Sequence, residues 1–134
     1  MRVLIVAENR DLAAIWGASL ERMGAVVKIE STQALAIRAL QGSVFEIVIL
    51  SLTLSEGSSL AVADFASYRH PDCRIIPVTS SSFFSDGSVF QHIPNACTTL
   101  GLSTPPEDVA AIVEHYGATQ PPVPVPSDES GSAR

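Results

Sequence analysis

Basic side chains are scarce in this sequence of 134 residues. Eight Lys and Arg residues stand against fourteen Asp and Glu residues, so the formal net charge is −6 at pH 7. A protein that tracks a nucleic-acid backbone needs clustered Lys and Arg to displace counterions, and the few basic residues here are scattered. The composition therefore argues against DNA, RNA and anionic membrane surfaces as partners.

Long apolar runs and metal-binding cysteine patterns are absent as well. No stretch approaches the roughly 18 to 20 apolar residues of a membrane span. The N-terminus lacks the long apolar stretch and the small-residue cleavage site of a signal peptide. Cys73 and Cys97 form neither a CxxC pair nor a metal-ligand spacing. We expect a cytoplasmic protein with free, buried thiols and with no metal or cofactor.

Short runs of aliphatic residues recur along the chain and predict buried strands. Apolar residues make up 46% of the sequence and aromatic residues only 6%, so Val, Ile, Leu and Ala must supply most of the core. The run from Val3 to Val6 is continuous, as expected of a strand that is covered on both faces. Strands are expected over residues 3–6, 25–29, 45–50, 74–78 and 96–100.

Longer segments with apolar residues at helical spacing separate these strands. Ser31 and Ser58 are the expected N-caps of the second and third helices. Pro105 or Pro106 is expected to start the last helix, and Gly117 to follow its end. Helical patterns occupy residues 11–23, 32–41, 59–69 and 106–116, and a weaker one lies in 80–95.

Strands that alternate with helices and are joined by short loops predict an α/β domain with a parallel sheet. Five such units within residues 1–118 predict one three-layer, doubly wound domain. The remaining residues, 119–134, are rich in proline and polar side chains. Such a composition cannot bury a core, so we expect a disordered tail.

Several patterned positions resemble the receiver domain of two-component response regulators. They are the strand Val3–Val6 before an acidic turn, the run 45–50 before a loop, the run 75–79, and Asn95-Ala96 before the expected fifth strand. The resemblance covers residues 1–118. It implies a flavodoxin-like, five-stranded sheet with strand order 2-1-3-4-5, and a phosphorylation site at the carboxyl edge of that sheet.

The resemblance also assigns positions to the phosphorylation site. In that family two acidic residues after the first strand and an aspartate ending the third strand bind magnesium, and that aspartate accepts the phosphoryl group. A Thr or Ser after the fourth strand and a Lys after the fifth contact the phosphoryl group. These positions correspond here to Ala7 and Glu8, to Ser51, to Thr79, and to the segment from Leu102 to Thr104.

Four of the family's chemical groups are therefore replaced. Of the two acidic positions after the first strand, only the one at Glu8 keeps a carboxylate, and serine is a far weaker nucleophile than a carboxylate at neutral pH. The only lysine of the chain, Lys28, falls in the expected second strand, and the family's aromatic switch residue corresponds to Thr98 or Thr99. These departures predict a degenerate pseudo-receiver with no catalytic residue and no metal site.

The expected function is that of a phosphorylation-independent, non-enzymatic module of bacterial signalling. It would bind a protein partner, or a second copy of itself, through the surface of the fourth helix, fifth strand and fifth helix that receivers commonly use. For the phenylalanines of that surface, core packing is an equally good interpretation. The residues expected there are Phe83, Phe84, Phe90, Gln91, His92, Glu107, Val109, Ile112 and His115.

Two other functions stay open as alternatives. One is phosphotransfer through a non-standard acceptor such as Ser51. The other is a flavin or nucleotide enzyme, which the acidic loop 7–11 disfavours because it would repel phosphate. Thr79 together with the serines 80–82 could also form an anion nest, for which an ordinary hydroxyl-rich loop is the simpler interpretation. The sequence leaves the partner, the pathway and the oligomeric state open.

Overall fold

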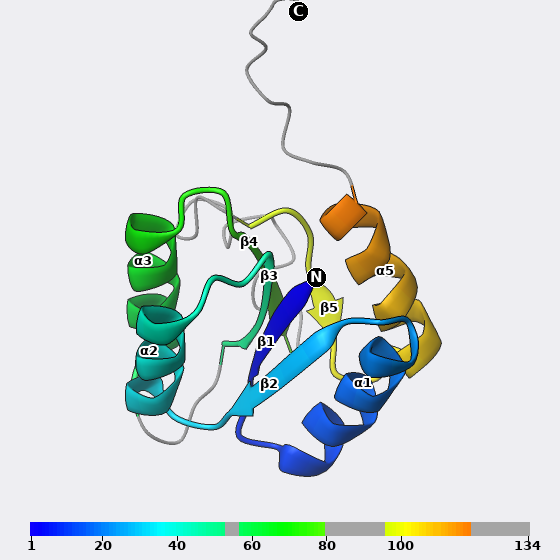
Figure 1. Cartoon of the computed structure of the whole chain (residues 1–134). Helices are drawn as coiled ribbons and strands as arrows, with labels where there is room; N and C mark the ends of the chain where they lie inside the picture. The colour runs from blue at the N-terminus through cyan, green and yellow to red at the C-terminus, as the bar shows by residue number, and fades with distance from the viewer. Residues whose placement is uncertain (53–56, 80–95, 119–134) are drawn as a thin grey trace, which may run out of the picture.

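Five parallel strands form the central sheet of the computed structural model, which describes residues 1–52, 57–79 and 96–118 (Figure 1). Neighbouring strands follow the order β2-β1-β3-β4-β5, and every neighbouring pair is parallel. The predicted fold class and strand order are thus confirmed. The strands are β1 (Arg2–Val6), β2 (Val26–Glu30), β3 (Ile47–Ser51), β4 (Arg74–Thr79) and β5 (Leu100–Gly101).

Helices cover both faces of the sheet and complete a three-layer domain (Figure 1). Helices α2 (Gln33–Gly42) and α3 (Ser59–Arg69) pack on one face. Helices α1 (Arg10–Arg22) and α5 (Pro106–Ala118) pack on the other. Each face has its own hydrophobic core, as expected of a doubly wound sheet.

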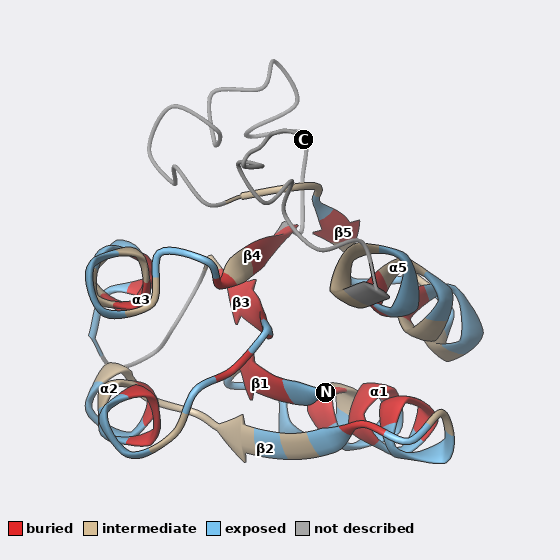
Figure 2. Cartoon of the chain, turned by 45° about the horizontal axis from the view of Figure 1, so that its top comes forward, coloured by how far each residue is buried: buried red, intermediate tan, exposed pale blue. Residues whose placement is uncertain are grey.

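The two central strands, β1 and β3, explain why the aliphatic runs of the sequence are continuous. Successive side chains of a strand point to opposite faces, so a strand buried on both faces needs apolar residues throughout. Leu4 and Leu50 pack toward α2 and α3, whereas Val3 and Ile49 pack toward α1 and α5. The edge strand β2 is more exposed, as Figure 2 shows by colour.

The helix N-termini are capped by short polar side chains. Asn9 Oδ1 accepts a hydrogen bond from the backbone N–H of Leu12 at 3.1 Å. Ser58 caps α3, as predicted. The prediction of Ser31 as the cap of α2 is wrong by one residue, because Thr32 has the extended backbone of a cap and its Oγ1 accepts from the N–H of Leu35 at 3.2 Å.

The fifth strand is shorter than predicted. Ala96 forms an isolated bridge with Ile75, and the regular ladder begins only where Leu100 pairs with Val78. Three positions separate Ile75 from Val78, whereas four separate Ala96 from Leu100. One extra residue therefore interrupts the ladder between the two points of pairing, as in a bulge.

The last helix and the thiols also differ in detail from the prediction. Gly117 lies within α5 rather than after it. Cys73 and Cys97 are both free, as predicted, but only Cys73 is fully buried and Cys97 is half-buried. The predicted helical segment 80–95 and the predicted tail 119–134 lie outside the described residues.

Candidate functional site

A cavity of about 220 Å³ lies at the carboxyl edge of the sheet. Parallel strands bring their carboxyl ends to the same edge, which is where doubly wound folds usually bind ligands. The lining residues come from β1, β3 and β4, from the loops after β1 and β5, and from the first half of α1. They are Ile5, Ala7, Glu8, Asn9, Leu12, Ala13, Trp16, Ile49, Ser51, Val78 and Leu102.

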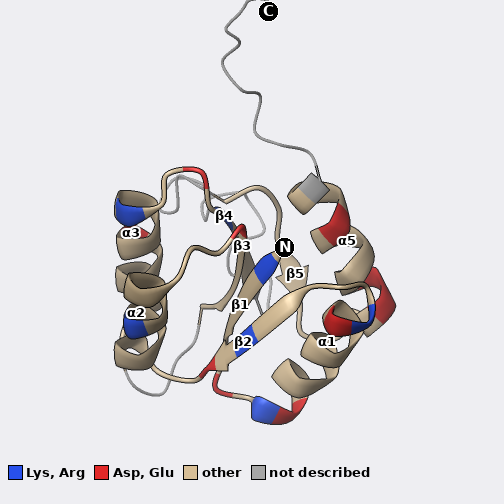
Figure 3. Ribbon diagram, viewed as in Figure 1, with Lys and Arg blue, Asp and Glu red and all other residues tan. Residues whose placement is uncertain are grey.

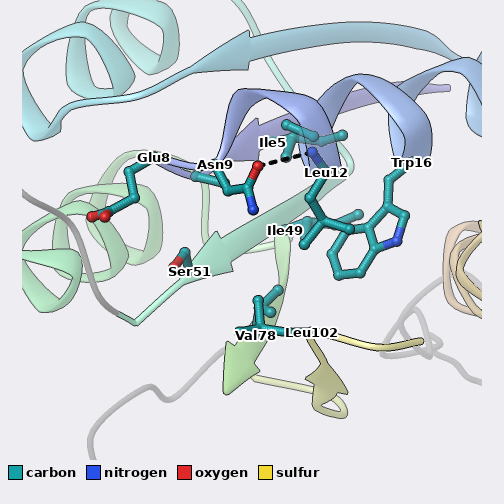
Figure 4. A pocket seen from close by; sticks show the side chains of 11 residues that line it. Ile5, Glu8, Asn9, Leu12, Trp16, Ile49, Ser51, Val78 and Leu102 are labelled. Carbon is teal, nitrogen blue, oxygen red and sulfur yellow. Dashed lines mark hydrogen bonds between the residues drawn. The ribbon is translucent and has the colours of Figure 1, made fainter. Parts of the chain in front are cut away.

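The cavity has a polar end and an apolar end (Figure 4). Glu8 and Ser51 lie at one end, and Trp16 lies at the other, beside Leu12 and Ile49. Apolar side chains form most of the lining. Among the lining residues that the structure describes, Glu8 is the only charged one.

The loop after β1 is fixed by hydrogen bonds at both of its ends. The N–H of Ala7 donates to the carbonyl oxygen of Glu30 at 3.0 Å. Asn9 uses its side-chain oxygen to cap α1. Glu8, between them, is exposed and is the single acidic residue among those that line the cavity, but its carboxylate points away from the other lining side chains (Figure 4).

Ser51 is held firmly at the end of β3. Ser51 is only 7% exposed, and its carbonyl oxygen accepts a hydrogen bond from Ser59 Oγ at 2.7 Å. The next residue, Leu52, donates its N–H to the carbonyl oxygen of Val78 at 3.2 Å. The structure therefore brings Ser51 to the same cavity as Ala7 and Glu8.

The segment after β5 brings no cation to the cavity. Leu102, which is 44% exposed, lines it with an apolar side chain. Thr104 closes a tight turn instead, because its Oγ1 accepts from the N–H of Gly101 at 3.1 Å and its own N–H donates to the carbonyl of Gly101 at 3.2 Å. Lys28 lies in the edge strand β2, where its Nζ is 3.5 Å from Glu30 Oε2.

The remaining positions that the sequence assigns to the site lie at the end of β4 and just before β5. Thr79 is the last residue of β4 and pairs with Gly101. Thr98 is half-buried and Thr99 is exposed, both in the segment between the isolated bridge and β5. The serines 80–82 lie outside the described residues.

Sequence reasoning did not assign Asn9, Leu12 and Trp16 to this site. Trp16 is a core residue, only 2% exposed, and it also forms the apolar end of the cavity. The positions 9, 12, 13 and 16 recur at helical spacing, so they share one face of α1 and its cap. That spacing predicts a shared face of the helix, but it does not predict that a cavity lies beside this face.

The residues of α5 that the sequence assigns to a partner surface differ in their exposure. Glu107 and His115 are exposed and Ile112 is half-buried. Val109 is wrongly assigned to this surface, because it is 0% exposed and packs in the core between the sheet and α1. The predicted residues that lie outside the described part of the chain are Phe83, Phe84, Phe90, Gln91 and His92.

The exposed face of α5 is acidic (Figure 3). Glu107, Asp108 and Glu114 are all exposed there, and no Lys or Arg occurs in this helix. The helices on the opposite face of the sheet carry Arg38 and Arg69. Helix α5 therefore presents a surface of one charge sign, whereas α1, on the same face of the sheet, carries both Arg10 and Asp11.

Two classes of site are not found in the part of the chain that the structure describes. No group of three or more His, Cys, Asp or Glu side chains is placed to hold a metal ion there. In the same residues, no helix has both the length and the apolar character needed to cross a bilayer.

Comparisons with known proteins find similarity to solved structures but not to sequences. No protein-family model and no curated protein matches the sequence. A CheY-like receiver domain protein from Methanospirillum hungatei superimposes with a TM-score of 0.79 at 20% identity, covering 89% of this chain and 94% of that one. The non-phosphorylated receiver domain of HemR from Leptospira biflexa gives 0.79 at 17% identity, covering 90% and 97%.

A third similar structure, NtrX, is known both as an isolated receiver domain and as a longer chain. The isolated receiver domain of NtrX from Brucella abortus superimposes with a TM-score of 0.78 at 16% identity, covering 87% of this chain and 98% of that domain. Against the longer NtrX chain the match spans only 27% of its length. The five-stranded order, the helices on both faces and these superpositions agree: this chain has the fold of a response regulator receiver domain.

Proposed function

We propose that this chain is a receiver-type signalling module, of the response regulator receiver family, that works without phosphoryl transfer. One observation carries the proposal. The cavity at the position of the family's phosphorylation site is lined by one carboxylate, a serine hydroxyl and a leucine side chain. In the family these positions hold a set of acidic residues, an acceptor aspartate and a lysine.

The donor set does not fit a magnesium ion. Magnesium demands near-octahedral oxygen coordination and is usually held by carboxylates together with phosphate and water. Glu8 is the single carboxylate that lines the cavity within the described residues, and the neighbouring Ala7 has no oxygen in its side chain. We therefore derive no step through magnesium.

The cavity also does not fit a phosphoryl group. Phosphoryl transfer needs positive charge around the transferring oxygens. The described lining contains no Lys, Arg or His, and its single charge is the negative one of Glu8. Ile49, two residues before Ser51, and Val78, which pairs with Ser51 from β4, extend the apolar wall as far as Ser51. Burial of an unpaired charge against such a wall is costly.

The proposed activity is therefore binding rather than catalysis. The exposed acidic face of α5, with Glu107 and Glu114, is the proposed docking surface, and its charge favours a partner with a basic surface. The proposed partner is a signalling protein of the bacterial cytoplasm with such a basic surface, and two copies of this chain would repel one another if their α5 faces met. Electrostatic attraction would mainly raise the association rate and weaken as salt is added.

The loss of phosphoryl transfer is tested by intact-mass spectrometry. The full chain is incubated with magnesium and a small-molecule phosphodonor such as acetyl phosphate, beside a receiver known to accept phosphate. We expect the mass of this chain to stay unchanged while the control gains one phosphoryl group. A gain of mass that Ser51→Ala abolishes would instead establish phosphotransfer through Ser51.

The docking surface is tested by capture of partners from native cell extract. Glu107→Lys and Glu114→Lys reverse two charges on α5, and Asp64→Lys is the matched control on α3, where Asp64 is also exposed. We expect a partner that the wild type retains to be lost with the α5 variants and kept with Asp64→Lys. Retention by all three variants would place the binding surface elsewhere.

A further inference from the structure

Strand β2 lies at the end of the sheet, and no described strand pairs with its outer edge (Figure 2). The N–H of Val26 donates to the carbonyl oxygen of Met1 at 2.9 Å, so Val26 turns its backbone polar groups toward β1. This direction alternates along a strand of a parallel ladder, and Val27 and Ile29 therefore turn their N–H and C=O groups to the outer edge. Such an edge is a template for pairing with another strand.

The charges on this edge are complementary to themselves. Lys28 Nζ lies 3.5 Å from Glu30 Oε2, and the two side chains are 55% and 17% exposed. Both line a hollow of about 240 Å³ beside α2, together with Arg38. In an antiparallel pair of β2 strands centred on Ile29, Lys28 of each copy lies opposite Glu30 of the other. A pair centred on Lys28 would instead oppose two lysines, so the charges select the register centred on Ile29.

Helix α1 has a second self-complementary pattern beside the same edge. A Cβ atom on Gly17 would lie 3.3 Å from Cγ1 of Val27 and 3.4 Å from Cδ1 of Ile29, so this side of α1 faces β2. Positions four before, seven before and four after Gly17 share that side of the helix. They are the exposed residues Ala14, Arg10 and Glu21. In an antiparallel pair of α1 helices Arg10 lies opposite Glu21, and the small residues between them allow a close approach.

The two patterns share one two-fold axis. The midpoint between Arg10 and Glu21 lies about one and a half residues before Gly17, which is roughly 2 Å along the helix. Gly17 stands level with Lys28, between its two contacts on β2, and α1 runs antiparallel to that strand. A strand advances about 3.3 Å per residue, so the midpoint lies within roughly 1 Å of the level of Ile29. Two independent charge patterns therefore select the same geometry.

From this coincidence we propose that the chain forms a symmetric dimer through the outer edge of β2. The two β2 strands run antiparallel, and α1 of each copy packs against α1 of the other. The dimer goes beyond the proposed function, because its interface lies at the opposite end of the sheet from β5 and leaves the exposed face of α5 free. Since α1 and α5 cover the same face of the sheet, the dimer presents both acidic α5 helices on one side.

Sedimentation equilibrium of the full chain tests the dimer. At an ionic strength of about 0.15 M the net charge of −6 is largely screened, whereas charges in contact still attract. We expect the average mass to rise from one chain toward two as the concentration rises to about 1 mM. Lys28→Glu and Glu30→Lys each place like charges opposite one another and should weaken the dimer about tenfold or more. Glu107→Lys on α5 is the matched control and should leave the dimer intact.

Mixing variants tests the register. An equimolar mixture of Lys28→Glu and Glu30→Lys should form a heterodimer, because every opposed pair then has opposite signs. Arg10→Glu and Glu21→Arg should behave in the same way, each weak alone and associated when mixed. If an edge variant fails to fold by circular dichroism, the α1 variants decide the question.

Hydrogen exchange gives a readout at the backbone. The N–H of Ile29 should become protected as the concentration rises, because it donates to Ile29 of the second copy. Four results would overturn the proposal: a single-chain mass at every concentration, a mass that rises past two chains, a dimer that both the edge and the α1 variants leave intact, or mixtures that do not associate.

Discussion

Trp16 joins two parts of the molecule that are far apart in the sequence. Its ring packs in the core beneath α1, and its indole N–H donates to the carbonyl oxygen of Thr104, in the turn before α5. A second bond, from Ser19 Oγ to the carbonyl oxygen of Pro106 at 3.0 Å, supports the same junction. These two bonds fix α1 against the turn that carries Leu102, and so they hold two walls of the cavity together.

Replacing Trp16 with phenylalanine should test this junction. The smaller ring leaves empty space in the core and removes the donor to Thr104, so we expect the free energy of unfolding to fall by about 2–4 kcal/mol. Tyr68→Phe is the matched control, because Tyr68 is 87% exposed. Urea unfolding followed by circular dichroism measures both, and an equal small effect of the two variants would contradict the role given to Trp16.

The two thiols differ in their surroundings. Burial, with smaller contributions from Cys97 and Glu46, raises the pKa of the Cys73 thiol to about 12. Burial also raises the pKa of Cys97, while the Arg74 guanidinium opposes that rise. Because the thiolate is the reactive form, iodoacetamide at pH 8 should modify Cys97 in the folded chain well before Cys73. Faster modification of Cys73 would contradict its burial.

The raised pKa of Cys73 also predicts a direction for stability at alkaline pH. Above about pH 9 the thiol ionises in the unfolded chain while the folded chain keeps its proton, so unfolding releases protons. The contribution of this thiol is therefore complete below pH 9 and is lost as pH rises toward 12, by at most about 1.4 kcal/mol per pH unit. Urea unfolding at pH 8 and 10 should show a smaller loss in Cys73→Ala than in wild type.

At the scale of elements, only one of two neighbouring hydroxyl residues, Thr32 and not Ser31, caps the N-terminus of α2. Thr32→Ala removes the cap and should lower the free energy of unfolding by about 1 kcal/mol. Ser31→Ala, one residue earlier, should change it by less than about 0.5 kcal/mol. Chemical denaturation of the two variants measures the difference, and a larger effect at Ser31 would restore the prediction made from the sequence.

The sequence predicted the elements well and their ends less well. Continuous aliphatic runs such as Val3–Val6 have one physical explanation, a strand buried on both faces, so the sheet followed from them. Ser31 and Thr32 are equally good caps by residue type, and only the register of β2, which continues to Glu30, decides between them. The extra residue that shortens β5 likewise depends on pairing with β4, which no local pattern encodes.

At the scale of the whole molecule, the parallel sheet explains why the predicted site residues converge. Ala7, Glu8, Ser51 and Leu102 follow or end three different strands, and all line one cavity. Val109 shows where analogy with the family's partner surface failed. It lies four residues before Val113, both are fully buried, and this spacing alone places them on the inward face of α5.

The sequence could not show that the replaced site remains open. The loss of carboxylates and lysine is visible in the residue types, but the remaining volume depends on how Trp16 and Leu12 pack against Ile49 and Val78. In the proposed function, the central feature of this domain is a cavity at the place of the family's phosphorylation site that lacks most of the family's charges. Its chemistry follows from the one carboxylate that lines it, Glu8.

The most direct test of that chemistry is a magnesium titration with and without beryllofluoride, a stable analogue of the phosphoryl group, followed by heteronuclear NMR of the full chain. It does not depend on the rate of transfer from any donor. The account predicts that the amide signals of Glu8, Ser51 and Leu52 show no saturable shift that requires both ions. A saturable shift of these signals that needs magnesium and beryllofluoride together would contradict it.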